Sequence, residues 1–422
     1  MADVMRAALL MAGMKRSQWM EESDMAELQG RRLRELVEYS RAEVPHYKKA
    51  LGEVKVRDID DLPSLPLTDK RMVRGMPDSF ISRRFEKNSL SKKVTSGSSG
   101  IPLTLYSTGA ESDYHLALEY QQMTEAGVGP LDLQAHVTYY RLEPHALQRL
   151  GLFRRVYLLN SDPEEKNLRA LKRLRPGVFH CYPSFLAPLA HVNMRDSIGF
   201  TVPRVFSSAE VLSPASRRLI TRSFQCDLRD LYGSTETSWI AWQCERGSMH
   251  LHSDSIIAEI VDGSGKPVKG GRAGSLVLTP LWKRAMPFIR YSIGDRASFA
   301  PACPCGRRGL RVMNPVQGRN DDFIVLRSGR FASARLVEEI VRSAPGVMQY
   351  QAIQSEPGEL LVRIVPSGKG IPESAKKAIA DGLRRSYREE MDIRFEAAGS
   401  LPRGGTGKLR SVISKVKPDA DT

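Results

Sequence analysis

The sequence predicts an α/β protein with a large N-terminal layered α/β domain, which includes a β-rich subdomain, and a small C-terminal α+β domain. Its 422 residues exceed one typical core, so two or three domains are expected. Helical and strand patterns alternate over residues 109–200, as in a sheet flanked by helices. After a polar, glycine-led segment at 318–322 the pattern restarts over about 100 residues. We therefore expect domains at 1–318 and 319–422.

Residues 22–43 form the first predicted helix, because apolar residues recur on one face at helical spacing. Pro45 ends it. Prolines within residues 52–75 predict loops, and residues 179–184 are expected to end a strand in a turn. The other predicted helices are 110–127, 162–173 and 372–390. The other predicted strands are 103–106, 135–140, 155–159, 228–232, 256–261, 275–279, 347–354, 359–365 and 392–397.

One stretch is made only of small or hydroxylated residues: Thr95, Ser96, Gly97, Ser98, Ser99 and Gly100. Glycines allow positive φ, so successive N–H groups can point into one concavity, and the hydroxyls add donors. A loop that holds a polyphosphate needs this chemistry. The alternative is a flexible Ser/Gly turn. The common pattern G-x-x-x-x-G-K-[ST] is absent.

Two later segments follow a strand with small residues and an acid. They are Ser208-Ala209-Glu210, and Tyr232-Gly233-Ser234-Thr235-Glu236. Strands that run into glycines, hydroxyls and a carboxylate form a suitable edge for a ligand. The tail, residues 401–410, predicts a glycine-rich loop with Lys408 near its end.

The net charge of +15 favours anionic partners. The chain lacks a nucleic-acid-binding motif and a long Lys/Arg tract, so small anionic ligands are favoured over nucleic acid. No run of about 18 apolar residues suggests a membrane span, and the start of the chain makes a poor signal peptide. Five cysteines argue against a disulfide framework, so we expect a cytoplasmic protein. A homodimer is left open.

Five motifs in one order resemble those of the adenylate-forming superfamily, which includes acyl-CoA synthetases, luciferases and adenylation domains. They are the Ser/Gly stretch before Pro102, Tyr232 to Glu236, Arg290-Tyr291-x-x-Gly294-Asp295, Gly318-Arg319-x-Asp321-Asp322, and Pro402-Arg403 to Gly407-Lys408. A finer resemblance is to the phenylacetate–CoA ligase family and its capsule-biosynthesis-like branch. It rests on Trp19…Gln29…Leu33…Val44-Pro45-x-Tyr47, Tyr182-Pro183-Ser184, Ser207 to Glu210 and Cys303-Pro304-Cys305-Gly306-Arg307.

The resemblance implies an ATP-dependent ligase with a mobile C-terminal domain. A carboxylate attacks the α-phosphate of ATP, giving acyl-AMP and pyrophosphate, and an acceptor, often coenzyme A, then displaces AMP. Because carboxylate and triphosphate repel each other, such a site must supply positive charge and alignment.

The resemblance assigns roles to individual residues. Lys408 would bridge the attacking carboxylate and the α-phosphate, Thr235 would hold that phosphate, and Glu236 would bind Mg²⁺. Asp295 would accept the ribose hydroxyls, supported by Arg319, and Asp321 would be the hinge. The segment Ser208 to Glu210 would lie along the adenine or acyl pocket. For Lys408, Glu236 and Asp295, the alternatives are a solvated tail lysine, a capping or surface acid and a structural turn. The family's phosphate loop often carries a lysine where this chain has Ile101, which weakens the point charge there.

Four further residues form a predicted metal site: Cys244, His250, Cys303 and Cys305. Three thiolates and an imidazole suit a closed tetrahedral Zn²⁺ site, and some members of the resembled family carry one. His252 is the alternative imidazole, and reduced cysteines without metal are the alternative to a site. Cys181 and Cys226 are expected to be buried apolar residues.

The sequence does not reveal which carboxylic acid is the substrate. Coenzyme A is the leading acceptor, although an acidic acyl-carrier protein or an amine would also suit the chemistry. A degenerate, non-catalytic nucleotide- or nucleic-acid-binding protein is the rival from another class. The joint presence of Glu236, Asp295, Arg319 and Lys408 argues against it.

Overall fold

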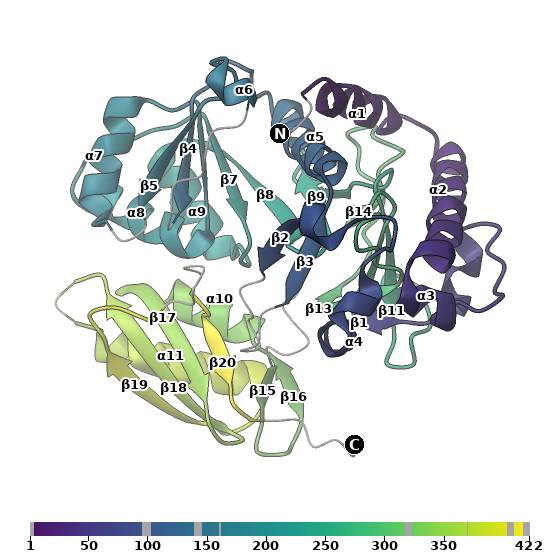
Figure 1. Cartoon of the computed structure of the whole chain (residues 1–422). Coiled ribbons are helices and arrows are strands. Elements are labelled where there is room, and N and C mark those ends of the chain that lie inside the picture. Colours follow the sequence, from purple (N-terminus) through teal and green to yellow (C-terminus); the bar gives the residue numbers. More distant parts are fainter. Residues whose placement is uncertain are drawn as a thin grey trace. The chain divides into compact units, whose positions relative to one another are not determined.

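The computed structural model describes residues 4–94, 103–138, 146–159, 162–316, 323–368, 370–402 and 409–416 (Figure 1). The chain divides into two compact units. Unit 1 comprises Met1–Asp132, Glu143–Arg154 and Arg229–Val316, and unit 2 comprises Leu133–Leu142, Arg155–Leu228 and Gln317–Thr422. The mixture of helices and sheets confirms the predicted α/β class. The predicted boundary between residues 318 and 319 lies outside the described residues and stays a prediction.

The helices of unit 1 are α1 (Val4–Ser17), α2 (Glu22–Glu43), α3 (Pro45–Ala50), α4 (Lys70–Gly75), α5 (Gly109–Glu125) and α6 (Ala146–Arg149), with 3₁₀ turns at Ile59–Ser64, Pro77–Phe80 and Lys87–Ser89. Its strands are β1 (Thr68–Asp69), β2 (Ser91–Val94), β3 (Thr104–Ser107), β8 (Asp227–Ser234), β9 (Ser238–Gln243), β10 (Met249–Leu251), β11 (Ile256–Val261), β12 (Gly274–Pro280), β13 (Tyr291–Ala297) and β14 (Val312–Met313).

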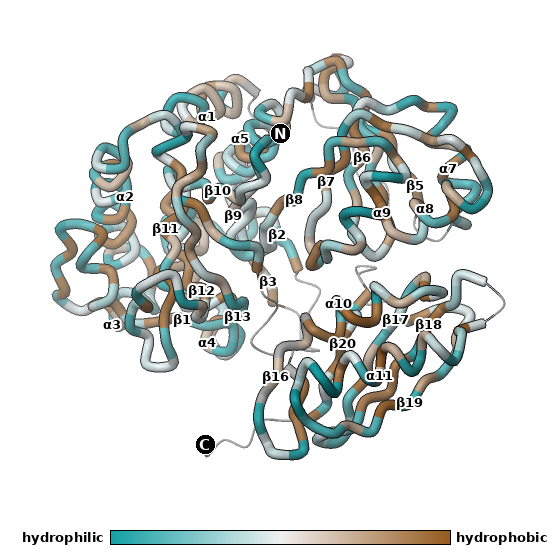
Figure 2. The backbone as a smooth tube through the Cα atoms, turned by 180° about the vertical axis from the view of Figure 1, so that it is seen from behind, coloured by the Kyte–Doolittle hydropathy of each residue, from teal (hydrophilic) through white to brown (hydrophobic). Residues whose placement is uncertain are grey.

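These strands form a four-stranded sheet in the order β1-β13-β12-β11, a run of strands in the order β14-β10-β9-β8, and the antiparallel pair β2-β3. Strands β11, β12 and β13 pair antiparallel, and β1 joins β13 in parallel. One face of α2 packs into the core beside Phe288 and Tyr291 through its buried Leu33, Leu36 and Val37. Figure 2 shows hydrophobic residues along β11, and every residue of this strand except Glu259 is buried.

The helices of unit 2 are α7 (Glu164–Leu174), α8 (Pro183–Arg195), α9 (Pro214–Phe224), α10 (Arg335–Ser343) and α11 (Glu373–Tyr387). Its strands are β4 (Gln134–Thr138), β5 (Arg155–Leu159), β6 (Val178–Cys181), β7 (Arg204–Ser208), β15 (Phe323–Val325), β16 (Phe331–Ser333), β17 (Val347–Gln354), β18 (Glu359–Pro366), β19 (Asp392–Ala397) and β20 (Val412–Ser414).

Strands β7-β6-β4-β5 are parallel neighbours in that order. Helices α7, α8 and α9 contribute the buried Leu171, Leu186 and Ile220 to a core shared with these strands (Figure 1). The strands of the C-terminal part lie in the order β19-β18-β17-β20, and α10 and α11 bury Val337 and Leu383 in the same core as β17 and β18. This is the predicted small α+β arrangement.

Two local predictions are wrong. Loops were expected over residues 52–75, but α4 forms there because Asp69 caps it: its Oδ1 accepts a hydrogen bond from Met72 N at 2.8 Å. A turn was expected at residues 182–184, but Pro183 is the first residue of α8, a position that suits its fixed φ. The predicted helix at 22–43 is confirmed by α2.

A buried arginine connects several segments of unit 1. The Arg290 guanidinium pairs with both Glu259 oxygens, at 2.9 and 3.0 Å, and donates to the carbonyls of Pro63, Leu65 and Gly265. Arg290 is 3% exposed, so its charge needs all these partners. The contacts fix the start of β13 against β11 and against the segment that leads into α4.

We expect Arg290→Ala to destabilise the chain by about 3–5 kcal/mol, because Glu259 would remain buried without its cation. Arg296→Ala is the matched control, since this arginine on β13 is only partly buried and donates to the Ala273 carbonyl. Denaturant unfolding monitored by tryptophan fluorescence gives both values. Equal stability of the two variants would show that the Arg290 contacts do not organise unit 1.

Candidate active site

The segment Tyr232 to Glu236 makes a tight connection from β8 to β9. A Cβ on Gly233 would lie 2.9 Å from both the Ser238 carbonyl oxygen and the Trp239 ring, so only glycine fits. Ser234 Oγ accepts a hydrogen bond from Thr237 N at 3.0 Å and closes the turn. Thr235 is exposed on this turn, whereas Glu236 is buried.

Tyr232 and Asp295 were predicted to serve the same site, and the structure brings them together. The Tyr232 hydroxyl donates to Asp295 Oδ2 at 2.5 Å. Asp295 lies on β13, five residues beyond the anchored Arg290, and is 8% exposed. This hydrogen bond fixes the Asp295 carboxylate beside the segment Tyr232 to Glu236.

Two lysines that the sequence reasoning missed lie at Glu236. Lys70 Nζ, at the first residue of α4, is 3.4 Å from Glu236 Oε1. Lys283 Nζ is 3% exposed and donates to the Glu236 backbone carbonyl at 2.9 Å. Burial lowers the pKa of Lys283, although the nearby Glu111 and Glu236 carboxylates oppose this shift. Lysine and arginine total 63 in this chain, so nothing in the sequence distinguished these two.

Glu111 holds the segment that carries Lys283. Its Oε2 accepts from Thr108 N at 2.7 Å and closes a capping box at the start of α5. Its Oε1 accepts from the backbone N–H groups of Arg284 and Ala285, at 2.5 and 3.0 Å. One carboxylate therefore fixes both the start of α5 and the residues beside Lys283.

In unit 2, the predicted segment Ser208 to Glu210 follows β7. Ser208 Oγ lies 2.8 Å from His180 Nε2. Ala209 has φ +68°, a conformation that is uncommon for a residue with a side chain. Glu210 accepts from Ser184 N and Ser184 Oγ, each at 2.9 Å, and so caps the positive end of α8.

The other predicted nucleotide-site residues lie outside the described residues. They are Thr95, Ser96, Gly97, Ser98, Ser99, Gly100, Arg319, Asp321 and Lys408. Their predicted roles stay predictions.

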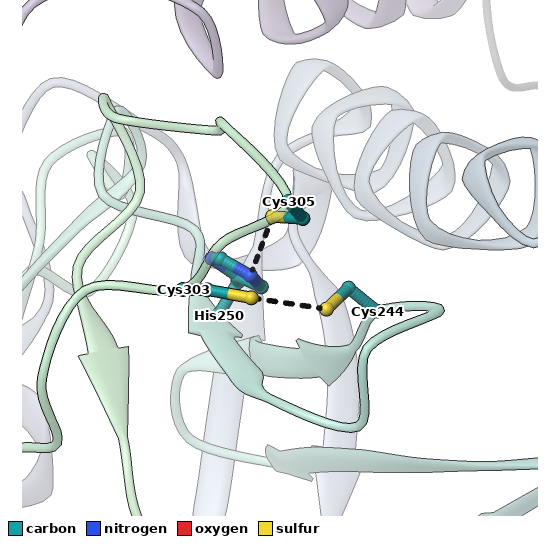
Figure 3. A group of neighbouring side chains, drawn as sticks. All are labelled: Cys244, His250, Cys303 and Cys305. Carbon is teal, nitrogen blue, oxygen red and sulfur yellow. Dashed lines mark hydrogen bonds between the residues drawn. The ribbon is translucent and has the colours of Figure 1, made fainter.

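A second group of side chains in unit 1 could hold a metal ion (Figure 3). The ligand atoms of Cys244, His250, Cys303 and Cys305 lie within 4.8 Å of one another. Cys244 Sγ is 3.7 Å from Cys303 Sγ, and Cys305 Sγ is 3.3 Å from His250 Nε2. His250 Nδ1 lies 3.4 Å from the Leu310 carbonyl oxygen, a contact that leaves Nε2 facing the thiols.

Arg307 supports the loop that bears Cys303 and Cys305. Its guanidinium lies 2.9 Å from both Glu125 and Glu245 and donates to Gln18 Oε1 at 3.1 Å. The same group lies over the rings of Trp19 and Trp242, each at 5.2 Å. Arg307 lies two residues after Cys305, so these contacts fix the orientation of Cys303 and Cys305. Trp19 and Arg307 were noted only as parts of resembled motifs.

His252, the alternative imidazole, lies outside the metal cluster. Its Nε2 is 3.4 Å from Gln122 Oε1, and its side chain is 1% exposed. Burial lowers the pKa of His252 to about 3. The structure therefore selects His250 over His252 as the fourth member of the cluster.

Comparisons with known proteins identify relatives of the chain. Residues 324–415 match the CapK C-terminal domain. A phenylacetate-coenzyme A ligase from Thermus thermophilus is 26% identical, over 92% of this chain and 96% of that protein. Protein CapK from Staphylococcus aureus is 22% identical, over 94% and 91%. The resemblance drawn from the motifs is thereby confirmed.

Solved structures give the same fold. The chain matches 2-hydroxyisobutyryl-CoA ligase in the postadenylation state with a TM-score of 0.80, at 19% identity, over 95% of this chain and 92% of that one. An anthranilate CoA ligase in complex with anthranoyl-AMP matches with a TM-score of 0.59, at 17% identity, over 78% and 67%. These matches confirm the predicted adenylate-forming enzyme fold. None of the described helices is long and apolar enough to cross a membrane.

The buried His252 generates a pH prediction. Its folded pKa of about 3 lies below the ordinary value of 6.5, so the unfolded chain binds a proton first as the pH falls. Stability is therefore complete above pH 6.5 and declines below it. From pH 7 to pH 5 this site costs the folded state about 2 kcal/mol. We expect the free energy of unfolding of His252→Gln, measured in guanidinium, to fall by about 2 kcal/mol less between pH 7 and pH 5 than that of the unchanged chain. Above pH 7 the two stability profiles should run parallel. An unchanged slope below pH 6.5 would contradict the assignment.

Proposed function

We propose that this chain, a homologue of the phenylacetate–coenzyme A ligases with the fold of the adenylate-forming enzymes, activates a carboxylic acid with ATP and transfers the acyl group to coenzyme A. One observation carries the proposal most directly. Two motifs that lie about 60 residues apart, Tyr232 to Glu236 and Arg290 to Asp295, meet through the 2.5 Å hydrogen bond between Tyr232 and Asp295. A nucleotide site built in this way needs both segments in place.

The proposed reaction has two steps. A carboxylate oxygen of the acid attacks the α-phosphorus of ATP, and the bond from that phosphorus to the bridging oxygen of pyrophosphate breaks. The thiolate of coenzyme A then attacks the acyl carbon, and the carbon–oxygen bond to AMP breaks. Positive charge is required in the first step, since two anions must approach each other. Lys408 would supply it at the α-phosphate, and Thr235 would donate its hydroxyl there.

The remaining roles follow from the described contacts and from the resemblance. Asp295 would accept from the ribose hydroxyls, with Arg319 beside them, and residues 95–100 would donate to the triphosphate. Glu236 offers a hard carboxylate oxygen that fits Mg²⁺, which would neutralise phosphate charge. The phosphate loop has Ile101 where the resembled family often has a lysine, so that positive charge is missing there. Lys70, which lies beside Glu236, would supply positive charge in its place. Asp321 would be the hinge between domains 1–318 and 319–422.

Coenzyme A is the acceptor that we favour. The net charge of +15 suits its phosphates. A solved structure of 2-hydroxyisobutyryl-CoA ligase contains both an acyl-AMP and coenzyme A, which supports this choice by analogy of fold. An acyl-carrier protein or an amine would use the same first step, so the adenylation test applies to all three acceptors.

The test is ATP–pyrophosphate exchange across aryl, fatty, amino and hydroxy acids, without coenzyme A. We expect Lys408→Ala to lower acyl-AMP formation at least about 100-fold while ATP binding is retained, because the cation acts on charge that develops in the transition state. Lys415→Ala, an exposed lysine of the same tail, is the control and should keep full activity. Undiminished exchange by Lys408→Ala would remove this residue from the mechanism. ATP binding without exchange for every acid would favour the non-catalytic rival.

We also propose that Cys244, His250, Cys303 and Cys305 bind one structural Zn²⁺. Three sulfurs and one imidazole nitrogen are a ligand set typical of closed zinc sites. The four groups already lie within 4.8 Å of one another, and Arg307 orients the loop. With no open position, such an ion would stabilise unit 1 and take no part in the chemistry.

Purified protein should therefore contain about one zinc per chain by elemental analysis. We expect Cys303→Ser to lose most of this zinc and to unfold at lower temperature, since one thiolate ligand is removed. Cys226→Ser is the control, because this buried cysteine lies outside the cluster and should leave the zinc content unchanged. A Cys303→Ser variant with full zinc content would exclude the proposed ligand set.

A further inference from the structure

Unit 1 contains a cavity whose lining includes none of the residues assigned to the nucleotide, the acid or the metal. Its volume is about 570 Å³, which lies within the range of small-molecule sites. The cavity is enclosed by α1, α2, α5 and the connection from β10 to β11. Helix α1 packs against α5 in this part of the molecule (Figure 1).

One face of α1 forms much of the apolar wall of the cavity. The lining positions recur at spacings of three and four over residues 6–17, so they share one face of the helix. The apolar side chains of the wall are Leu9, Leu10 and Met14 on α1, Met20 after it, and Leu28 on α2. Gly13 lies on the same face, and a Cβ added there would meet no atom within 4 Å. The cavity is therefore open beside Gly13.

A buried carboxylate lies in the lining of the cavity. Asp254 is 4% exposed, and its Oδ2 and Oδ1 accept from the hydroxyls of Ser17 and Ser255, at 2.6 and 2.8 Å. Ser17 has a single hydroxyl proton, and the Met14 carbonyl competes for it at 3.0 Å. No ion pair with this carboxylate occurs among the described residues. Because a carboxylate offers about four acceptor positions, Asp254 keeps capacity for a charged donor.

Arg32 brings the opposite charge to the same cavity. It follows Leu28 by one turn of α2, so the two side chains lie on one face of that helix. Its guanidinium donates to the backbone carbonyl of Asp254, which uses one of five donors. In the described part of the chain, no carboxylate lies within ion-pair distance of Arg32. The cavity thus holds a cation and an anion close together that form no ion pair with each other.

The other two arginines of the lining are exposed to water. Arg6 pairs with Asp113 at 3.2 Å, so its charge is balanced within the chain. Arg16 is exposed, and water and salt weaken the attraction of such a charge for a ligand. Arg32 and Asp254 are therefore the charges that act most strongly on a molecule inside the cavity.

We propose that this cavity binds a free α-amino acid with an apolar side chain. The ammonium group donates to Asp254, the carboxylate accepts from Arg32, and the side chain packs against the wall of leucines and methionines. A zwitterion satisfies both charges at once. A carboxylic acid without the amine leaves Asp254 unpaired, and an amine without the carboxylate leaves Arg32 unpaired, so both should bind more weakly. This binding site goes beyond the proposed adenylation and does not depend on it.

The test is isothermal titration calorimetry on the full-length protein without ATP. The ligands are leucine and phenylalanine, each compared with its deaminated and its decarboxylated analogue. The analogues are isocaproate and isoamylamine for leucine, and hydrocinnamate and phenethylamine for phenylalanine. We expect at least one of the amino acids to bind about tenfold or more tightly than both of its analogues, as one charge-assisted hydrogen bond allows.

Two charge variants assign the binding to this cavity. Asp254→Asn and Arg32→Gln should each weaken the binding of the amino acid by about tenfold or more, because each removes one charge that the ligand meets. Asp24→Asn and Arg31→Gln are the matched controls, since both side chains are exposed on α2 and lie outside the cavity. Both controls should keep the full affinity.

A third variant fills the cavity and leaves its charges in place. Gly13→Leu should abolish binding, because the new side chain occupies the open space beside the wall. Its unfolding midpoint should be unchanged or higher, since leucine favours a helix more than glycine does. Ala12→Leu, at an exposed position of α1 outside the cavity, is the control and should bind normally.

Three results would overturn the proposal. They are the absence of binding by both amino acids, equal affinity for an amino acid and either of its analogues, and full affinity in Gly13→Leu. Loss of binding in the three variants with full affinity in their controls would establish the site. None of these results depends on ATP–pyrophosphate exchange, so the proposed function is tested separately.

Discussion

The guanidinium of Arg290 is the constraint on which the arrangement of unit 1 depends. It joins Glu259 on β11 to the carbonyls of Pro63, Leu65 and Gly265. Arg290 itself has φ +47°, and such a strained residue persists only where its surroundings fix it. Five residues after Arg290, strand β13 carries Asp295. The position of a site carboxylate is thus set by a buried ion pair that has no chemistry of its own.

Buried supporting groups also fix the segment Tyr232 to Glu236. The Tyr232 hydroxyl fixes Asp295, and Lys283 fixes the Glu236 backbone. Both supporting groups are partly or fully buried, so water competes poorly for their hydrogen bonds. A site held in this way loses little entropy when a nucleotide binds, because its side chains are already oriented.

The two units contain side-chain groups of different chemistry. The sulfur-rich cluster of unit 1 suits a soft, closed metal site that stabilises a loop. On the parallel strands of unit 2, His136 lies beside His180, and His180 Nε2 lies 2.8 Å from Ser208 Oγ, while Phe206 is aligned with His180 on the same face.

The sequence by itself determined the α/β class, the course of α2, the paired cysteines and the order of the nucleotide motifs, because each depends on local spacing or residue type. Only the tertiary structure selected His250 over His252, joined Lys70 and Lys283 to Glu236, and placed His136 beside His180. The longest of these contacts joins Lys70 to Glu236, 166 positions further along the chain. Register and packing decide such distances, and a linear pattern carries no record of them.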